Sequence, residues 1–126
     1  MRILVVDDDP DLSTLMEIFL GRAGHDVELA PDGRCGLRRL LAGGFDAVVL
    51  DWMMPTLDGL GLTRAVRSDP ALRDLPLLMV TARRDHAAAY AAGVDEVLDK
   101  PFSGAGLVSA VETLGRRTPA RAGSAS

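Results

Sequence analysis

The sequence predicts an α/β fold in which helices cover both faces of a parallel β-sheet. Five short apolar runs alternate along the chain with segments whose apolar residues recur at helical spacing. The runs are apolar almost throughout, which is typical of strands buried on both faces. A length of 126 residues with 48% apolar and 25% charged residues suits one globular domain.

The first strand, residues 3–6, leads into a predicted core-facing helix. Pro10 stands at a position favoured in the first turn of helices, and Gly24 can close the helix at its other end. The apolar stripe of this helix comprises Leu12, Leu15, Met16, Phe19 and Leu20.

A second strand is predicted at residues 27–30 and a third at 47–50. Between them, residues 32–42 have helical character that Gly33 and Gly36 weaken, because glycine has a low helix propensity.

The second half of the chain continues the alternation of helices and strands. Helices are predicted at residues 60–67 and 85–92, and a further helix is marked by apolar residues between 107 and 114. Strands are predicted at residues 77–80 and 94–98. Residues 117–126 are rich in Pro, Ala, Gly and Ser, which indicates a flexible tail or the start of a linker after a domain of residues 1–116.

Composition excludes several classes of function for this domain. A net charge of −4 and a pI near 5.0 argue against direct nucleic-acid binding, because no basic stripe is present to contact phosphates. No signal-peptide pattern precedes the first strand, and no apolar run approaches the length of a membrane span. Cys35 is the only cysteine, which fits a reducing compartment. We therefore expect a cytoplasmic protein without a membrane segment.

Chemically active side chains follow four of the predicted strands. Asp7, Asp8 and Asp9 follow the first strand and Asp51 follows the third. The other two strand ends carry Thr81 and Lys100, and Lys100 is the only lysine beside thirteen arginines. Because the carboxyl ends of parallel strands lie along one edge of a sheet, we expect these side chains to converge there.

Carboxylates that converge repel one another unless one takes up a proton or a cation neutralises them. Oxygen ligands suit Mg²⁺ or Mn²⁺, whereas the chain has no His or Cys cluster for zinc. Beside such a cation, Asp51 can act as a nucleophile toward a phosphoryl group and form an aspartyl phosphate. Lys100 and Thr81 then supply a cation and a hydroxyl donor for the phosphoryl oxygens.

Four motifs resemble the receiver domain of two-component response regulators, in the order found in that family over about residues 1–116. The motifs are Leu4-Val5-Val6-Asp7-Asp8-Asp9, Asp51-Trp52-Met53-Met54-Pro55 with Asp58-Gly59, Val80-Thr81-Ala82 and Lys100-Pro101-Phe102. The resemblance implies a flavodoxin-like (βα)5 single domain with a five-stranded parallel sheet.

The resemblance also implies the role of each site residue. Asp51 accepts phosphate from a histidine kinase or phosphotransfer protein, Asp8, Asp51 and the Met53 carbonyl bind Mg²⁺ directly, and Asp7 acts mainly through water. Lys100 contacts the phosphoryl group and Thr81 moves toward it. The domain is then a signalling module rather than an enzyme acting on an external metabolite. Its partners are a downstream effector or fused output domain and, after phosphorylation, a second copy in a dimer.

Two other classes of function fit the sequence less well. A phosphatase of the haloacid-dehalogenase type also has an aspartate nucleophile after a strand, but it needs a second acid where this chain has Met53. A Rossmann-like nucleotide binder needs a glycine-rich loop after the first strand, where three acids would repel phosphates.

Two features depart from the family pattern. Val97 stands where the family usually has a Tyr or Phe, three residues before the lysine. The spacing from Thr81 to Gly93 is also about three residues shorter than usual, which removes roughly one turn from the fourth helix or the loop before it. Tyr90 is interpreted as a packing residue of that helix rather than as a substitute for the missing ring.

Overall fold

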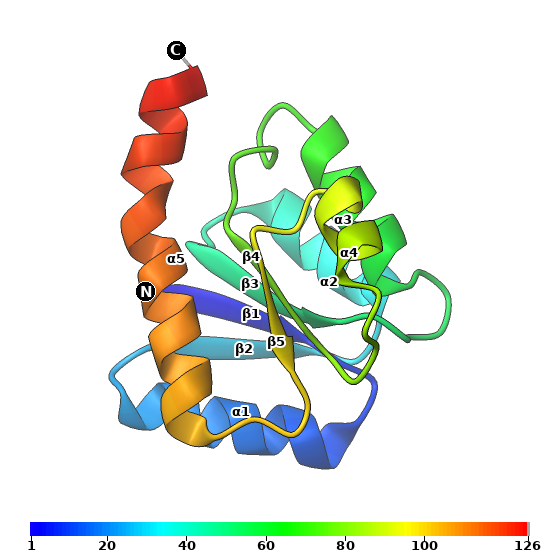
Figure 1. The fold of residues 1–126 in the computed structure, drawn as a ribbon, viewed down its shortest axis with the longest axis vertical. Coiled ribbons are helices and arrows are strands. Elements are labelled where there is room, and N and C mark those ends of the chain that lie inside the picture. Colours follow the sequence, from blue (N-terminus) through cyan, green and yellow to red (C-terminus); the bar gives the residue numbers. More distant parts are fainter. Residues whose placement is uncertain (126) are drawn as a thin grey trace.

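Five parallel strands form one sheet in the order β2-β1-β3-β4-β5 (Figure 1). The computed structural model describes the backbone of residues 1–125 and the side chains of residues 1–116. The strands are β1 (Arg2–Val6), β2 (Asp26–Ala30), β3 (Ala47–Asp51), β4 (Leu77–Thr81) and β5 (Glu96–Asp99). This architecture confirms the predicted flavodoxin-like α/β fold.

Five helices cover the two faces of the sheet. They are α1 (Pro10–Arg22), α2 (Gly33–Ala42), α3 (Gly59–Ser68), α4 (His86–Ala92) and α5 (Gly104–Ala125). Helices α1 and α5 pack on one face, and α2, α3 and α4 lie on the other (Figure 1).

The core therefore consists of two layers that the sheet separates. Ile3 and Val5 of β1 belong to the layer under α1 and α5, whereas Leu4 and Val6 belong to the opposite layer. Successive side chains of a strand point to opposite faces, so an unbroken apolar run supplies both layers at once.

Helix α1 has the predicted ends but a different buried face. Asp9 is its N-cap residue, and Gly24, with a φ of 93°, terminates it with a bond from the His25 N–H to the Leu20 carbonyl at 3.1 Å. Leu15, which was predicted to face the core, is 42% exposed, so this prediction is wrong. Ser13 is buried instead, because α1 is rotated so that its hydroxyl reaches the Asp7 carbonyl.

The two glycines of α2 have a packing role that outweighs their low helix propensity. A Cβ at Gly33 would collide with the carbonyl group of Leu57, and a Cβ at Gly36 would lie 2.9 Å from Val6 Cγ2. Their absent side chains let α2 approach β1 and the loop after β3 closely.

Strand β5 begins two residues later than the predicted range of 94–98. The Val94 N–H bonds to the Ala89 carbonyl at 3.2 Å, so Val94 still closes the C-terminal turn after α4. The Asp95 N–H donates to the Leu77 carbonyl, and the register pairs with β4 begin at Glu96. Helix α4 has only 7 residues, in agreement with the short spacing between Thr81 and Gly93. The predicted tail, residues 117–126, lies outside the residues whose side chains are described, and its role as a linker stays a prediction.

Replacing Gly59 with alanine should lower the free energy of unfolding by at least about 2 kcal/mol, because the new Cβ would collide with the Asp51 carbonyl oxygen and the Trp52 Cα. Gly21→Ala is the matched control, since nothing lies within 4 Å of a Cβ there. That change should raise stability by about 0.5–1 kcal/mol through helix propensity. Urea denaturation followed by circular dichroism measures both values, and equal stability of the two variants would contradict this account.

Candidate phosphorylation and metal site

The register of the sheet places the ends of β1, β3, β4 and β5 at one edge. Val6 pairs with Leu50, Leu50 pairs with Met79, and Thr81 pairs with Asp99. The residues predicted to form a site therefore emerge from adjacent strands at the same level, or directly after them.

Asp7, Asp8 and Asp51 form an acidic cluster whose ligand atoms lie within 4.8 Å of one another. Asp8 is exposed and Asp51 is partly buried, whereas Asp7 is only 2% exposed. The Asp9 backbone N–H donates to Asp7 Oδ1 at 2.9 Å. Within the described part of the chain, Asp7 Oδ2 is buried without a hydrogen-bond partner.

The environment of Asp7 favours its protonated form. Burial, more than any other cause, raises the pKa of this carboxyl from 3.8 to about 6. The negative charges of Asp51 and Asp8 contribute to this shift in pKa, while the Asp9 N–H and the Lys100 charge oppose it. Near pH 7 the positive charge of Lys100 therefore does not neutralise the three carboxylates of the cluster.

Lys100 and Asp51 face each other across the site. Lys100 Nζ lies 3.4 Å from Asp51 Oδ2, and the Trp52 N–H donates to Asp51 Oδ1 at 2.7 Å. The Asp51 side chain is 13% exposed, so this carboxylate is held in place while one side remains open to solvent.

Thr81 is buried at the end of β4, with 2% of its surface exposed. Its hydroxyl oxygen accepts a hydrogen bond from the Arg83 backbone N–H at 3.1 Å, and its carbonyl accepts one from the Lys100 N–H at 2.9 Å. Thr81 therefore links the loop after β4 with the end of β5. Asp9 caps α1 and lies outside the acidic cluster.

Arg83, two residues beyond Thr81, lies across the rim of the site. Its guanidinium carbon is 4.4 Å from the centre of the Trp52 ring, its Nη1 is 3.9 Å from Met53 Sδ, and its Nη2 pairs with Asp85 at 3.1 Å. Met53 is itself 60% exposed. An arginine stacked on the residue after Asp51 joins the loops that follow β3 and β4.

Tyr90 reaches the position where the aromatic ring is missing. Its hydroxyl accepts a hydrogen bond from the Val97 N–H at 3.2 Å and donates one to Glu96 Oε1 at 2.9 Å. The interpretation of Tyr90 as a packing residue is wrong, because its side chain is 44% exposed and its hydroxyl instead ties α4 to the backbone of β5. His86 adds a second tie, with Nε2 at 2.7 Å from Asp99 Oδ1.

The fold and the acidic edge define a receiver-type α/β signalling domain. Residues 3–112 match the family model described as response regulator receiver domain. The chain therefore belongs to the response regulator receiver domain family of two-component signalling.

Individual relatives support this assignment. The chain is 45% identical over 121 residues to response regulator MprA of Mycolicibacterium vanbaalenii, covering 94% of this chain and 52% of that protein. It is 38% identical over 120 residues to the DNA-binding dual master transcriptional regulator RpaA of Synechocystis sp., covering 93% and 50%. The chain thus spans about half the length of these curated relatives.

Solved structures agree with the fold. A putative response regulator from Chloroflexus aurantiacus superimposes with a TM-score of 0.88 at 34% identity, covering 92% of this chain and 98% of that one. The receiver domain of Francisella response regulator 1452 gives a TM-score of 0.87 at 31% identity, covering 93% and 98%.

In the part of the chain that the structure describes, every helix is too short or too polar to cross a membrane.

The raised pKa of Asp7 should make the stability of the metal-free domain fall as the pH rises from about 4 to 7. In this range the folded state holds a proton on Asp7 that the unfolded state has lost, so rising pH favours unfolding, by up to about 2–3 kcal/mol from this group. Asp7→Asn should lack this contribution. Urea denaturation in EDTA at pH 4.5 and 7.5 measures it, and a stability difference between wild type and variant that does not grow with pH would refute the assignment.

Proposed function

We propose that this domain accepts a phosphoryl group on Asp51 from the phosphohistidine of a histidine kinase or phosphotransfer protein. The observation that carries the proposal is the pairing of Asp51 with Lys100 at 3.4 Å, beside two further carboxylates at the open edge of a receiver-family sheet. Asp51 is held by the Trp52 N–H and stays open on one side, as an acceptor of an incoming phosphoryl group must.

In the proposed transfer, a carboxylate oxygen of Asp51 forms a bond to phosphorus as the bond from phosphorus to the histidine nitrogen breaks. The histidine nitrogen of the donor keeps the electron pair of the broken bond. It takes up a proton, so the donor's side chain is released as a neutral imidazole. Lys100 stabilises the phosphoryl oxygens as negative charge develops on them. The domain thereby assists its own phosphorylation and, with water as the acceptor, its own dephosphorylation, without turning over an external substrate.

The acidic cluster fits a hard divalent cation, Mg²⁺ or Mn²⁺. The ligand atoms are all oxygens, and the buried Asp7 Oδ2 lacks a partner among the described residues. Asp8, Asp51 and the Met53 carbonyl would hold the ion directly, and Asp7 mainly through water. When bound, the ion neutralises the repulsion between the carboxylates and the phosphoryl group.

Thr81 is proposed to report phosphorylation to the rest of the domain. Its buried hydroxyl accepts a hydrogen bond from the Arg83 N–H, and its carbonyl accepts one from the Lys100 N–H. A new bond from the hydroxyl to a phosphoryl oxygen would therefore shift both the β4–α4 loop and the end of β5. A conformational change needs a difference in interaction free energy between two states, and the new bond to the phosphoryl oxygen would supply it.

The output is proposed to be control of an effector, either a separate protein or a domain joined through residues 117–126, with residues 1–116 as the receiver. Relatives of twice the length, one of them described as DNA-binding, support a fused effector. The receiver itself is acidic, with a net charge of −4, so DNA contact would belong to the effector. We also propose that the domain forms a dimer when it is phosphorylated and that the protein is cytoplasmic.

Incubation with acetyl phosphate and Mg²⁺ should add one acid-stable, hydroxylamine-labile phosphate, and Asp51→Asn should abolish it. Intact-mass and peptide mass spectrometry locate the group. Asp11→Asn is the matched control, because Asp11 is an exposed aspartate in the first turn of α1. Labelling of Asp51→Asn at the wild-type level would sink the assignment of the acceptor.

Addition of Mg²⁺ should change the fluorescence of Trp52, the only tryptophan, because its backbone N–H is bonded to the ligand carboxylate of Asp51. Asp8→Ala should weaken the fluorescence-derived affinity about tenfold or more, and by more than Asp7→Ala does, since Asp8 is proposed to bind the ion directly and Asp7 mainly through water. Unchanged affinity in Asp8→Ala would rule out direct ligation by that residue.

A further inference from the structure

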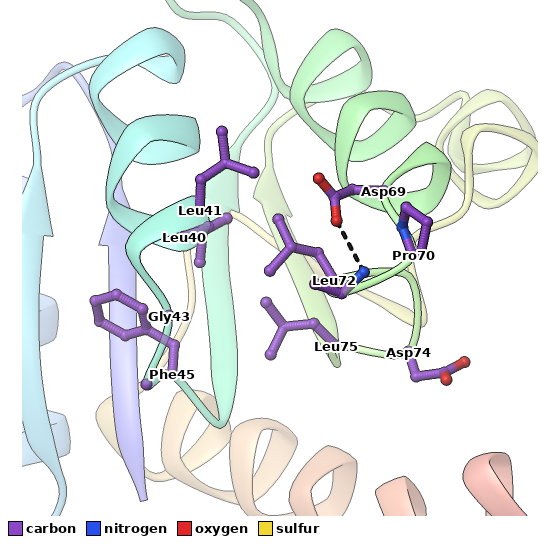
Figure 2. A pocket seen from close by; sticks show the side chains of 11 residues that line it. Leu40, Leu41, Gly43, Phe45, Asp69, Pro70, Leu72, Asp74 and Leu75 are labelled. Atoms are coloured by element: carbon purple, nitrogen blue, oxygen red, sulfur yellow. Dashed lines mark hydrogen bonds between the residues drawn. The ribbon is translucent and has the colours of Figure 1, made fainter.

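An apolar groove opens at the end of the molecule opposite the acidic edge. It has a volume of about 420 Å³ and lies between the turn from α2 to β3 and the loop from α3 to β4 (Figure 2). Leu40, Leu41 and Phe45 form one wall, and Leu72 and Leu75 form the other. A volume of this size is within the range of sites that bind small molecules or single side chains of a partner.

Leu41 makes this groove different from a simple packing defect. Its side chain is 56% exposed at the rim, although it belongs to the last turn of α2 directly beside the buried Leu40. An exposed leucine over an apolar hollow presents a continuous apolar surface to solvent, and surfaces of this kind are typical of interaction sites.

One wall of the groove is held in a defined shape by Arg67. This side chain is only 18% exposed, and its Nη1 donates to the carbonyls of Arg73 at 2.9 Å and Leu75 at 2.7 Å. Its Nη2 pairs with Asp95 at 2.9 Å. The loop that carries Leu72 and Leu75 is therefore fixed before any partner binds, which lowers the entropic cost of binding.

The charge of the groove selects among partners. Asp69 and Asp74 lie at its rim, and the lining residues include no lysine or arginine. Among the nearby arginines, Arg67 donates to the Leu75 carbonyl and pairs with Asp95, and Arg2 lies 4.4 Å from the centre of the Phe45 ring and pairs with Glu28. Arg73 stands between Leu72 and Asp74 in the chain but does not line the groove. An occupant with a positive charge beside its apolar group would complement both the walls and the rim.

We propose that this groove docks a peptide segment of a partner protein in which an apolar side chain stands next to an arginine or lysine. The apolar side chain enters between Leu41 and Leu72, and the basic side chain lies at the carboxylates of Asp69 and Asp74. This surface is separate from the acidic edge and goes beyond the proposed phosphotransfer.

The test is an NMR titration of the ¹⁵N-labelled chain with two tetrapeptide amides, arginine-leucine-phenylalanine-arginine and its counterpart with glutamates in place of both arginines. The basic peptide should shift amide signals in residues 40–45 and 69–75 and bind about threefold or more tightly than the acidic one at low salt. Equal binding of the two peptides, or shifts confined to another surface, would overturn the proposal.

Two variants separate the contribution of charge to peptide binding from the contribution of apolar contact. Asp74→Asn should reduce the preference for the basic peptide, and Leu41→Ala should weaken both peptides by about three- to tenfold. Both residues are exposed, so the fold is expected to remain intact. Leu15→Ala is the control, because this leucine is 42% exposed on α1. A loss in the control as large as in Leu41→Ala, or a dimer that Leu41→Ala dissociates in sedimentation, would also contradict the assignment.

Discussion

Hydrogen bonding between the parallel strands is the constraint on which the acidic edge depends. The pairing of Val6 with Leu50 and of Thr81 with Asp99 sets the level at which each following side chain leaves the sheet. A slip by one residue would turn every side chain of a strand to the opposite face. The two apolar layers prevent this slip, since the side chains of residues 3–6 in β1, which alternate between the layers, are fully buried. Packing of the core thus fixes the geometry of the site.

The site concentrates an electrostatic cost that the packed core has to offset. Asp7 is buried beside two other carboxylates, and its raised pKa shows that the folded state tolerates its charge poorly. Lys100 lies next to Asp51 and lowers this cost only in part. The repulsion among these carboxylates lowers the stability of the metal-free domain. The same repulsion favours binding of any ligand that brings positive charge to the carboxylate oxygens.

The segments around Asp51 are fastened on two sides. Gly59 packs against the backbone of Asp51 and Trp52, and its N–H donates to the Trp52 carbonyl at 2.7 Å. On the other side Arg83 stacks on the Trp52 ring. The loop after Asp51 is therefore in direct contact with the loop that leads to α4. Helix α4 in turn is tied to β5 by Tyr90 and His86, which provides a contiguous set of contacts from the acidic edge to the α4–β5 face.

The order of strands and helices, the two buried layers and the acidic edge were all predictable from the sequence, because each apolar run and the residue that ends it are local features. The placement of Asp7, Asp8, Asp51, Thr81 and Lys100 at this edge could be predicted for the same reason, while their roles stay a prediction. Only the tertiary structure decided the exposure of Leu15, the late start of β5 and the stacking of Arg83 on Trp52. These depend on how elements distant in sequence approach each other, and helical or strand periodicity carries no information about the distance or rotation between two packed elements.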